Sequence, residues 1–192
     1  DAPPRSFVRR LRDLGFSFDE ARGVLGLVFL AGTLTTAAAL PRIVALLIDT
    51  RQFSALRDDP AAIPLAIAEG LRFTTPVPAT VRIAQRDATV RGHHIRAGTR
   101  VVLMTCNLTR DGSMFPDAFT FSALRTQPAR ARNLWYGAGP HFCLGFAIAQ
   151  RQLQMVVERL VALRGTLRVV GRAPARGVIV PAYRHLRLRL DP

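Results

Sequence analysis

The chain has 192 residues, with 27 Lys and Arg against 13 Asp and Glu, so its formal net charge is +14. Every one of these cations is an arginine, because the sequence contains no lysine. The length suffices for one domain with a sizeable core, and a hydrophobic share of 49% excludes a disordered chain. Two cysteines, Cys106 and Cys143, do not form a disulfide framework, and Asp1–Arg5 lacks a signal-peptide pattern. We therefore expect a folded protein of the reducing cytoplasm.

The strong positive charge raises the question of nucleic-acid binding, which a pI near 11.7 would suit. That function requires basic side chains gathered on one face and interleaved with aromatic residues. Here the arginines are spread from Arg5 to Arg189, and aromatic residues make up only 7% of the chain. We expect no nucleic-acid partner, whereas an acidic protein partner fits the charge at least as well.

The first long element is a predicted helix from about Asp19 to Asp49. Ser17 and Glu20 have the spacing of a capping box, which satisfies free backbone amides at a helix start. Gly23–Leu40 contains no charged residue, and such a length would allow a membrane crossing. Three threonines lie within this segment, and a helix that is apolar all round also fits the core of a large domain. We favour the core helix over the membrane span.

The rest of the chain predicts shorter elements around one small strand region. In chain order these are a helix within residues 60–73, short strands over 80–102, an irregular stretch over 107–133, a helix from near Cys143 to about Leu163, and strand segments over 169–190. We find no repeat and no linker. The expected fold class is mainly α with a small β region.

The segment Trp135–Gly145, WYGAGPHFCLG, carries the most chemical information. Gly137 and Gly139 let a loop approach a large flat group. Cys143 is expected at a helix N-terminus, where backbone dipoles favour a thiolate, and His141 can bond an anion beside it. Such a thiolate can be a nucleophile, a redox sensor or a metal ligand, and an axial ligand of haem iron fits this combination. A buried structural cysteine is the alternative.

This segment resembles the haem-binding loop of the cytochrome P-450 family, F-G-x-G-x-H-x-C-x-G. It matches every fixed position except the first, where Tyr136 replaces phenylalanine. The resemblance implies that Cys143 is the proximal ligand of haem b (iron protoporphyrin IX), and that His141 and Arg82 each bond a propionate. The cofactor-binding residues implied in this way are Cys143, His141, Arg82, Gly137, Gly139, Tyr136, Phe142 and Gly145.

The segment Glu69-Gly-Leu-Arg72 resembles the E-x-x-R element of the same family and is expected to form a structural ion pair. The family closes this pair into a triad with an arginine of the later meander. This chain has Thr120 at that position, and Arg125 matches a nearby family arginine that is not expected in the same role. The sequence therefore predicts an incomplete triad.

Within the long helix, Ala31–Thr36 (AGTLTT) resembles the family's A-G-x-[D/E]-T-T. The resemblance implies that Gly32 leaves room over the iron and that the Thr35 hydroxyl holds the water that protonates bound oxygen, with Thr36 completing the catalytic set. Leu34 occupies the position of the acid. This departure removes the usual carboxylate of the proton relay.

By resemblance, residues 1–192 are the C-terminal part of a cytochrome P-450 haem domain without its N-terminal helices. The part comprises the long central helix, the E-x-x-R helix, the small sheet, the meander, the cysteine loop and the following helix. The implied function is a bacterial, cytoplasmic haem-thiolate monooxygenase (an oxidoreductase) that inserts one oxygen atom from dioxygen into an apolar small molecule.

Electrons would come from a partner of the ferredoxin and ferredoxin reductase type, with Arg130, Arg132 and Arg151 expected on the docking face. Two alternatives stay open. Because of Leu34, the enzyme could use peroxide in place of dioxygen. The chain could also be a non-catalytic truncated remnant or an auxiliary protein.

Overall fold

The computed structural model describes residues 6–192, which form six α-helices, four short 3-10 helices and six strands. The α-helices are α1 (Phe7–Asp13), α2 (Phe18–Asp49), α3 (Ala55–Asp58), α4 (Ile63–Thr74), α5 (Thr105–Leu108) and α6 (Phe146–Val161). The 3-10 helices are η1 (Pro60–Ala62), η2 (Ala129–Ala131), η3 (Leu134–Tyr136) and η4 (Gly139–His141). The strands are β1 (Thr80–Ile83), β2 (Ala88–Val90), β3 (His93–Ile95), β4 (Arg100–Leu103), β5 (Thr166–Pro174) and β6 (Tyr183–Asp191).

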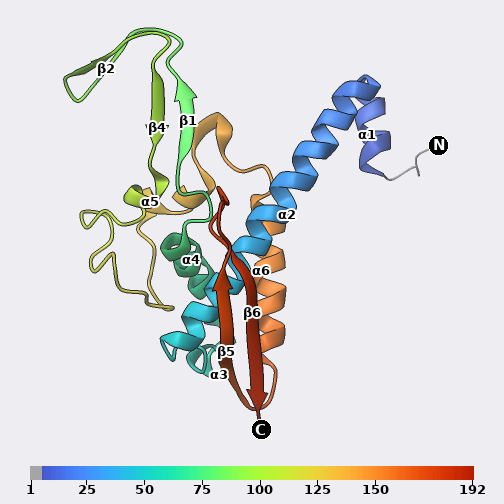
Figure 1. The fold of residues 1–192 in the computed structure, drawn as a ribbon, viewed down its shortest axis with the longest axis vertical. Helices are drawn as coiled ribbons and strands as arrows, with labels where there is room; N and C mark the ends of the chain where they lie inside the picture. Colours follow the sequence, from blue (N-terminus) through green and yellow to red (C-terminus); the bar gives the residue numbers. More distant parts are fainter. Residues whose placement is uncertain (1–5) are drawn as a thin grey trace.

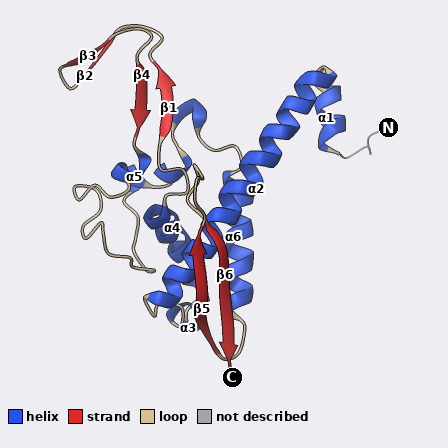
Figure 2. Ribbon diagram, viewed as in Figure 1, coloured by secondary structure: helices blue, strands red, loops and turns tan. Residues whose placement is uncertain are grey.

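The expected fold class, mainly α with small β elements, is confirmed (Figure 2). The strands form three antiparallel pairs, β1–β4, β2–β3 and β5–β6. The short helices α1, α3 and α5 were not predicted, because each is too brief to show a helical period.

Helix α2 begins with the expected capping box. The Ser17 amide donates to Glu20 Oε2 at 2.8 Å, and the Glu20 amide donates to Ser17 Oγ at 3.3 Å. The helix then runs without interruption through Pro41 to Asp49. The predicted bounds of this element are therefore correct to within a residue.

The core surrounds the C-terminal half of α2, which packs against α4 and α6. Ile43 and Leu47 of α2 are fully buried there, as are Ile67 of α4 and Val157 of α6. Gly70 allows α4 to approach α2 closely, because a Cβ atom at this position would lie 2.8 Å from Ile43 Cγ1. This half of α2 is a core helix, as the sequence predicts.

The N-terminal half of α2 projects from the body of the structure together with α1 (Figure 1). Its apolar side chains are exposed, with Leu27 at 67% and Phe29 at 75% of full accessibility. The helix is long and apolar enough to cross a membrane, and only 11% of its most apolar window is buried. Core helices also meet these criteria, and α2 enters the core from Ala38 onward.

The β5–β6 hairpin lies along the buried half of α2, and both of its strands contact that helix (Figure 1). Its register runs from Thr166 opposite Asp191 to Pro174 opposite Tyr183. Residues 175–182 form the turn that joins the strands, and the Ala175 amide donates to the Ala182 carbonyl at 2.9 Å.

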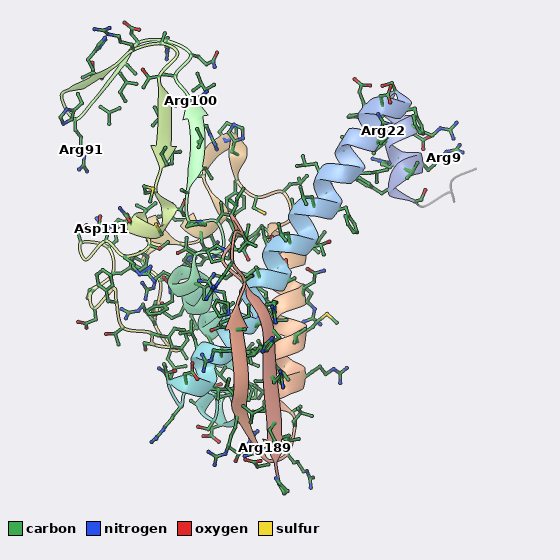
Figure 3. All side chains as sticks on the ribbon, viewed as in Figure 1. Arg9, Arg22, Arg91, Arg100, Asp111 and Arg189 are labelled. Carbon is green, nitrogen blue, oxygen red and sulfur yellow. The ribbon has the colours of Figure 1, made fainter. Side chains whose placement is uncertain are left out.

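Arginines occur at distant parts of the surface. Figure 3 shows Arg9 and Arg22 at the projecting end of α1 and α2, Arg91 at the tip of the β2–β3 hairpin, Arg100 at the β1–β4 pair, and Arg189 at the opposite end of the molecule. The labelled arginines do not gather on one face. A nucleic-acid interface would require basic side chains gathered on one face.

Candidate functional site

The cysteine loop, residues 134–145, folds into two 3-10 turns followed by Cys143 and the start of α6. The Cys143 amide donates to the Tyr136 carbonyl at 2.9 Å, which closes the loop on itself. The Phe146 amide donates to the Cys143 carbonyl at 3.2 Å and joins the loop to α6. These backbone bonds fix the position of the thiol relative to the helix.

The sulfur of Cys143 lies close to the N-terminal end of α6. A Cβ atom at Gly145, the N-cap residue of α6, would be 3.9 Å from Cys143 Sγ. The sequence predicts a helix that begins near Cys143, whereas α6 begins three residues later, at Phe146. The thiol is free and half-buried.

Two glycines shape the loop in different ways. Gly137 has φ +84°, and a Cβ atom there would lie 3.1 Å from the His141 carbonyl oxygen, so the tight turn requires glycine. Gly139 has φ +62°, and a Cβ atom there would meet no atom within 4 Å. The surface over Gly139 is therefore open to a ligand.

Aromatic side chains of the loop pack against the first residue of α6. The ring of Tyr136 stands edge-on to that of Phe146 at 5.0 Å, and Phe142 lies 5.4 Å from the same Phe146 ring. The Tyr136 hydroxyl is buried and has no hydrogen-bond partner among the described residues. Desolvation raises the pKa of Tyr136 above its usual range, and the nearby Cys143 charge raises it further.

These residues fit an iron porphyrin. One thiol near a helix N-terminus would supply the sulfur ligand, Gly139 would leave space for a flat group, and His141, two residues after Gly139, is exposed. Arg82 is exposed on β1, and its Nη1 donates to the Val81 carbonyl at 2.9 Å. Figure 1 draws the loop between the β1–β4 pair and α2.

The residues of the AGTLTT segment lie on α2, just before the helix enters the core at Ala38. Thr35 Oγ1 donates to the Ala31 carbonyl at 2.7 Å, and a Cβ atom at Gly32 would meet no atom within 4 Å. Thr35 and Thr36 are half-buried, whereas Leu34 is 52% exposed. In the described part of the chain, neither Thr35 nor Arg82 makes a hydrogen bond to the cysteine loop.

The E-x-x-R residues form a fully buried ion pair in α4. Arg72 donates from Nε to Glu69 Oε2 at 2.7 Å and from Nη2 to Glu69 Oε1 at 2.8 Å. Arg72 Nη1 also donates to the carbonyls of Thr109 and Ala118, both at 2.8 Å. Arg72 thereby ties α4 to the irregular segment that leads to the cysteine loop.

The expectation of an incomplete triad was wrong. Arg125 donates from Nε to Glu69 Oε1 at 3.1 Å, and its Nη2 bonds the Thr120 carbonyl at 3.0 Å. Gln127 Nε2 donates to Glu69 Oε2 at 3.1 Å. The sequence argument placed the third member at Thr120 and passed over Arg125, because linear spacing does not show how the meander folds back on α4.

The fold defines a mainly helical domain with small antiparallel sheets and a cysteine loop, and comparisons with known proteins define the family. The "Cytochrome P450" family model matches residues 62–162. This chain belongs to the cytochrome P450 family.

A "Putative cytochrome P450 140" of Mycobacterium tuberculosis is 39% identical over 134 residues, which are 69% of this chain and 30% of the relative. The "Vitamin D3 dihydroxylase" of Streptomyces griseolus is 34% identical over 145 residues, which are 74% of this chain and 35% of the relative. The structure of cytochrome P450-153 from Novosphingobium aromaticivorans superposes with a TM-score of 0.82 at 31% identity, covering 92% of this chain and 45% of that one. The chain thus spans about a third of the curated relatives it matches.

Proposed function

We propose that this chain is the C-terminal part of a haem-thiolate monooxygenase that inserts one oxygen atom from dioxygen into an apolar small molecule. The observation that carries the proposal is the placement of the Cys143 sulfur against Gly145 at the start of α6. When bound, haem with a cysteine thiolate ligand supplies the activation and cleavage of the O–O bond. The similarity to a protein named "Vitamin D3 dihydroxylase" supports an apolar substrate.

The chain's own residues would have distinct tasks in this activity. Cys143 would hold the iron, and His141 and Arg82 would bond the propionates. Gly137 and Gly139, with Gly145, would keep the loop backbone close to the porphyrin, while Tyr136 and Phe142 would exclude water from the thiolate side. On α2, Gly32 would leave space for substrate, and the Thr35 and Thr36 hydroxyls would hold protons near it.

The test is the carbon monoxide difference spectrum of the reduced, haem-reconstituted chain, with Cys143→Ala and Cys106→Ala compared. Both cysteines are free and half-buried, so Cys106→Ala is a matched control. A strongly red-shifted Soret band that survives Cys106→Ala and is lost in Cys143→Ala is the expected result. If wild type lacks the band, residues 1–192 alone do not bind haem through a thiolate, and a non-catalytic remnant or auxiliary role is favoured.

The exposed apolar face of α2 supports the proposal that the chain is part of a larger domain. Leu27, Phe29 and Leu30 are each more than 60% exposed, which is unusual for a water-facing helix surface. We propose that the N-terminal helices of the same fold cover this face and complete the substrate pocket. Co-expression of such an N-terminal portion should protect residues 24–34 from hydrogen exchange, whereas unchanged exchange would contradict the proposal.

The proposed electron donor is a small acidic protein of the ferredoxin type, working with its reductase in the bacterial cytoplasm. Arg130, Arg132 and Arg151 are exposed and flank the cysteine loop in sequence. The formal net charge of +14 supports attraction of an acidic partner.

Charge reversal of these three arginines to glutamate should raise the apparent KM for ferredoxin with little change in kcat. The matched control reverses Arg9, Arg22 and Arg91, which Figure 3 places on other parts of the surface. An equal effect of both triple variants would mean that net charge, and not a docking face, governs the reaction.

A second candidate function is peroxide-dependent oxygenation, which one observation favours. Leu34 stands at the acid position, and α2 carries no carboxylate between Glu20 and Asp49. Peroxide brings oxygen already reduced and needs less proton delivery. Turnover with peroxide but not with ferredoxin and dioxygen would support this candidate, and Leu34→Asp should then raise dioxygen-supported turnover.

A further inference from the structure

The turn formed by residues 116–120 carries a phenylalanine that faces solvent. Phe119 is 76% exposed, whereas Phe115 and Phe121, in the same irregular segment, are both buried. The segment thus folds its other phenylalanines into the protein and leaves this one outside. Burial of such a side chain against a partner would remove a large apolar area from water, which is favourable.

The backbone of the 116–120 turn is held firmly by two arginines. They bond four of its five carbonyls: Arg125 bonds those of Pro116 at 2.6 Å, Asp117 at 3.3 Å and Thr120 at 3.0 Å, and Arg72 bonds that of Ala118 at 2.8 Å. Both arginines also bond the buried carboxylate of Glu69. Phe119 therefore projects from a rigid base, and little backbone freedom is left to lose when a partner binds it.

A cation supports the exposed ring. The Cζ atom of Arg110 lies 5.9 Å from the centroid of the Phe119 ring and 5.3 Å from that of Phe73 in α4. Arg110 Nη2 also donates to the Phe73 carbonyl at 3.0 Å, which fixes the guanidinium against α4. Attraction between the cation and the ring orients Phe119. Aromatic residues and arginine are the residue types most enriched in protein–protein interfaces.

The charge around Phe119 favours an acidic partner. In the described part of the chain, Arg110 donates a hydrogen bond only from Nη2, so its other N–H groups can bond a carboxylate. Arg130 is held to the same segment, because its Nη2 donates to the Ser113 carbonyl at 2.7 Å. Residues 107–133 contain four arginines and two aspartates, and the chain has a net charge of +14. A second copy of the chain would bring like charges together, which disfavours self-association.

We propose that Phe119 and Arg110 form the anchor of a docking surface for a small acidic electron-transfer protein. An apolar patch of the partner would cover the Phe119 ring, and a carboxylate beside that patch would bond Arg110. The choice of partner rests on the proposed function, whereas the anchor is a property of the turn. Because Arg72 and Arg125 join the turn to Glu69, a partner bound at Phe119 is held against the same rigid unit that precedes the cysteine loop.

Calorimetric titration of the full chain with an acidic 2Fe–2S ferredoxin tests the anchor, comparing wild type with Phe119→Ala and Phe119→Tyr. The matched control is Phe18→Ala, because Phe18 is 81% exposed and begins α2 at the projecting end of the molecule (Figure 1). Phe119→Ala is expected to raise the Kd about tenfold, whereas Phe119→Tyr and Phe18→Ala should leave it nearly unchanged. The Tm of Phe119→Ala should equal that of wild type, because the side chain is exposed. Equal Kd values for Phe119→Ala and Phe18→Ala would overturn the anchor.

The salt dependence separates the apolar contact from general charge attraction. Salt screens exposed charges, so the loss of affinity in Arg110→Leu should shrink as the salt concentration rises. The ratio of Kd values between Phe119→Ala and wild type should persist at high salt, because burial of the ring does not depend on charge. A ratio that falls to one at high salt would overturn the apolar part of the anchor.

Two further measurements distinguish the partner from the alternatives. Sedimentation of wild type and Phe119→Ala detects self-association, and a wild-type dimer that Phe119→Ala dissociates would show that a second copy is the occupant. The carbon monoxide spectrum tests the proposed function separately: a missing band refutes haem–thiolate activity, while the titration still decides the anchor. An intact band in a wild-type chain that does not bind ferredoxin would overturn the partner class alone.

Discussion

Glu69 Oε1 accepts a hydrogen bond from Arg125 Nε at 3.1 Å, although 56 residues separate them in sequence. The same carboxylate is fully buried and also bonds Arg72, Gln127 and the Ser122 amide. Glu69 therefore connects α4 to the segment that precedes the cysteine loop. Its loss should affect the fold as a whole.

Replacing Glu69 by alanine leaves the fully buried Arg72 without its carboxylate. Removing one partner of a buried pair is expected to lower the free energy of unfolding by about 3–5 kcal/mol. Urea titration measures the change, with Glu158→Ala as the control, because Glu158 makes a surface pair with Arg151 that is worth about 0–1 kcal/mol. Similar losses in both variants would contradict the central role of the buried cluster.

Arg57 joins α3 to the C-terminal end of α6. Its guanidinium donates to the carbonyls of Val161, Leu163 and Gly165, at 3.3, 2.9 and 2.9 Å. These carbonyls lie at or just beyond a helix end, where intrahelical donors are lacking. Arg57→Leu is expected to lower the free energy of unfolding by roughly 1–3 kcal/mol. Arg164→Leu, which removes a neighbouring exposed arginine, should have little effect in the same thermal unfolding experiment.

Replacing Gly70 and Gly26 by alanine is expected to change the stability of the fold in opposite directions, which tests how α2 and α4 pack. A methyl group at Gly70 would overlap Ile43, so Gly70→Ala should destabilise by about 1–3 kcal/mol through overpacking. Gly26 lies in the exposed half of α2 with free space around it, so Gly26→Ala should stabilise by up to about 1 kcal/mol through helix propensity. Adding Ile43→Ala to Gly70→Ala should reduce the clash, and strict additivity of the two losses would argue against direct contact.

The buried hydroxyl of Tyr136 predicts a pH effect. The pKa of Tyr136 is raised in the folded chain, so its stability contribution is present below the ordinary tyrosine pKa and is lost as pH rises through the higher folded value. In the haem-free folded chain, the phenol absorbance of Tyr136 should not change over the pH range in which a tyrosine ordinarily titrates.

Tyr136→Phe should remove the alkaline decline in stability. It should also keep or slightly increase stability at neutral pH, because it deletes a buried hydroxyl that has no partner among the described residues. Titration of Tyr136 at the ordinary tyrosine pKa in the folded wild-type chain would show that its hydroxyl is not buried.

The sequence predicted those features of the fold that depend on residues close together in the chain. The capping box at Ser17, the long helix to Asp49 and the strand region around Val90 depend on residues close together in the chain. Helix α6 was placed too early, because Cys143 and Leu144 continue its apolar pattern although Gly145 is the N-cap. The cysteine loop was also predicted from sequence, because its glycines lie close to Cys143 in the chain.

Long-range contacts could not be read from the sequence. Arg57, Arg42 and Arg125 are three among many arginines, and nothing near them in the chain marks the carbonyls or the carboxylate that they bond. Trp135 was noted only as part of a motif, yet it is buried in the main core cluster. The roles of Thr35, His141 and Arg82 toward a cofactor stay predictions.

The unbroken path of α2 from Thr35 to Asp49 restricts where this helix can change in length. One residue inserted between Thr35 and Arg42 would turn everything after it by about 100° and carry Arg42 and Asp49 away from Pro181 and Arg172, the hairpin residues that they bond. The same insertion before Gly26 would rotate only the projecting end of α2 and leave Arg42 and Asp49 in their positions relative to the core. Insertions and deletions are thus expected to be tolerated in the exposed half of α2 and to disrupt the fold in the half that contacts the hairpin.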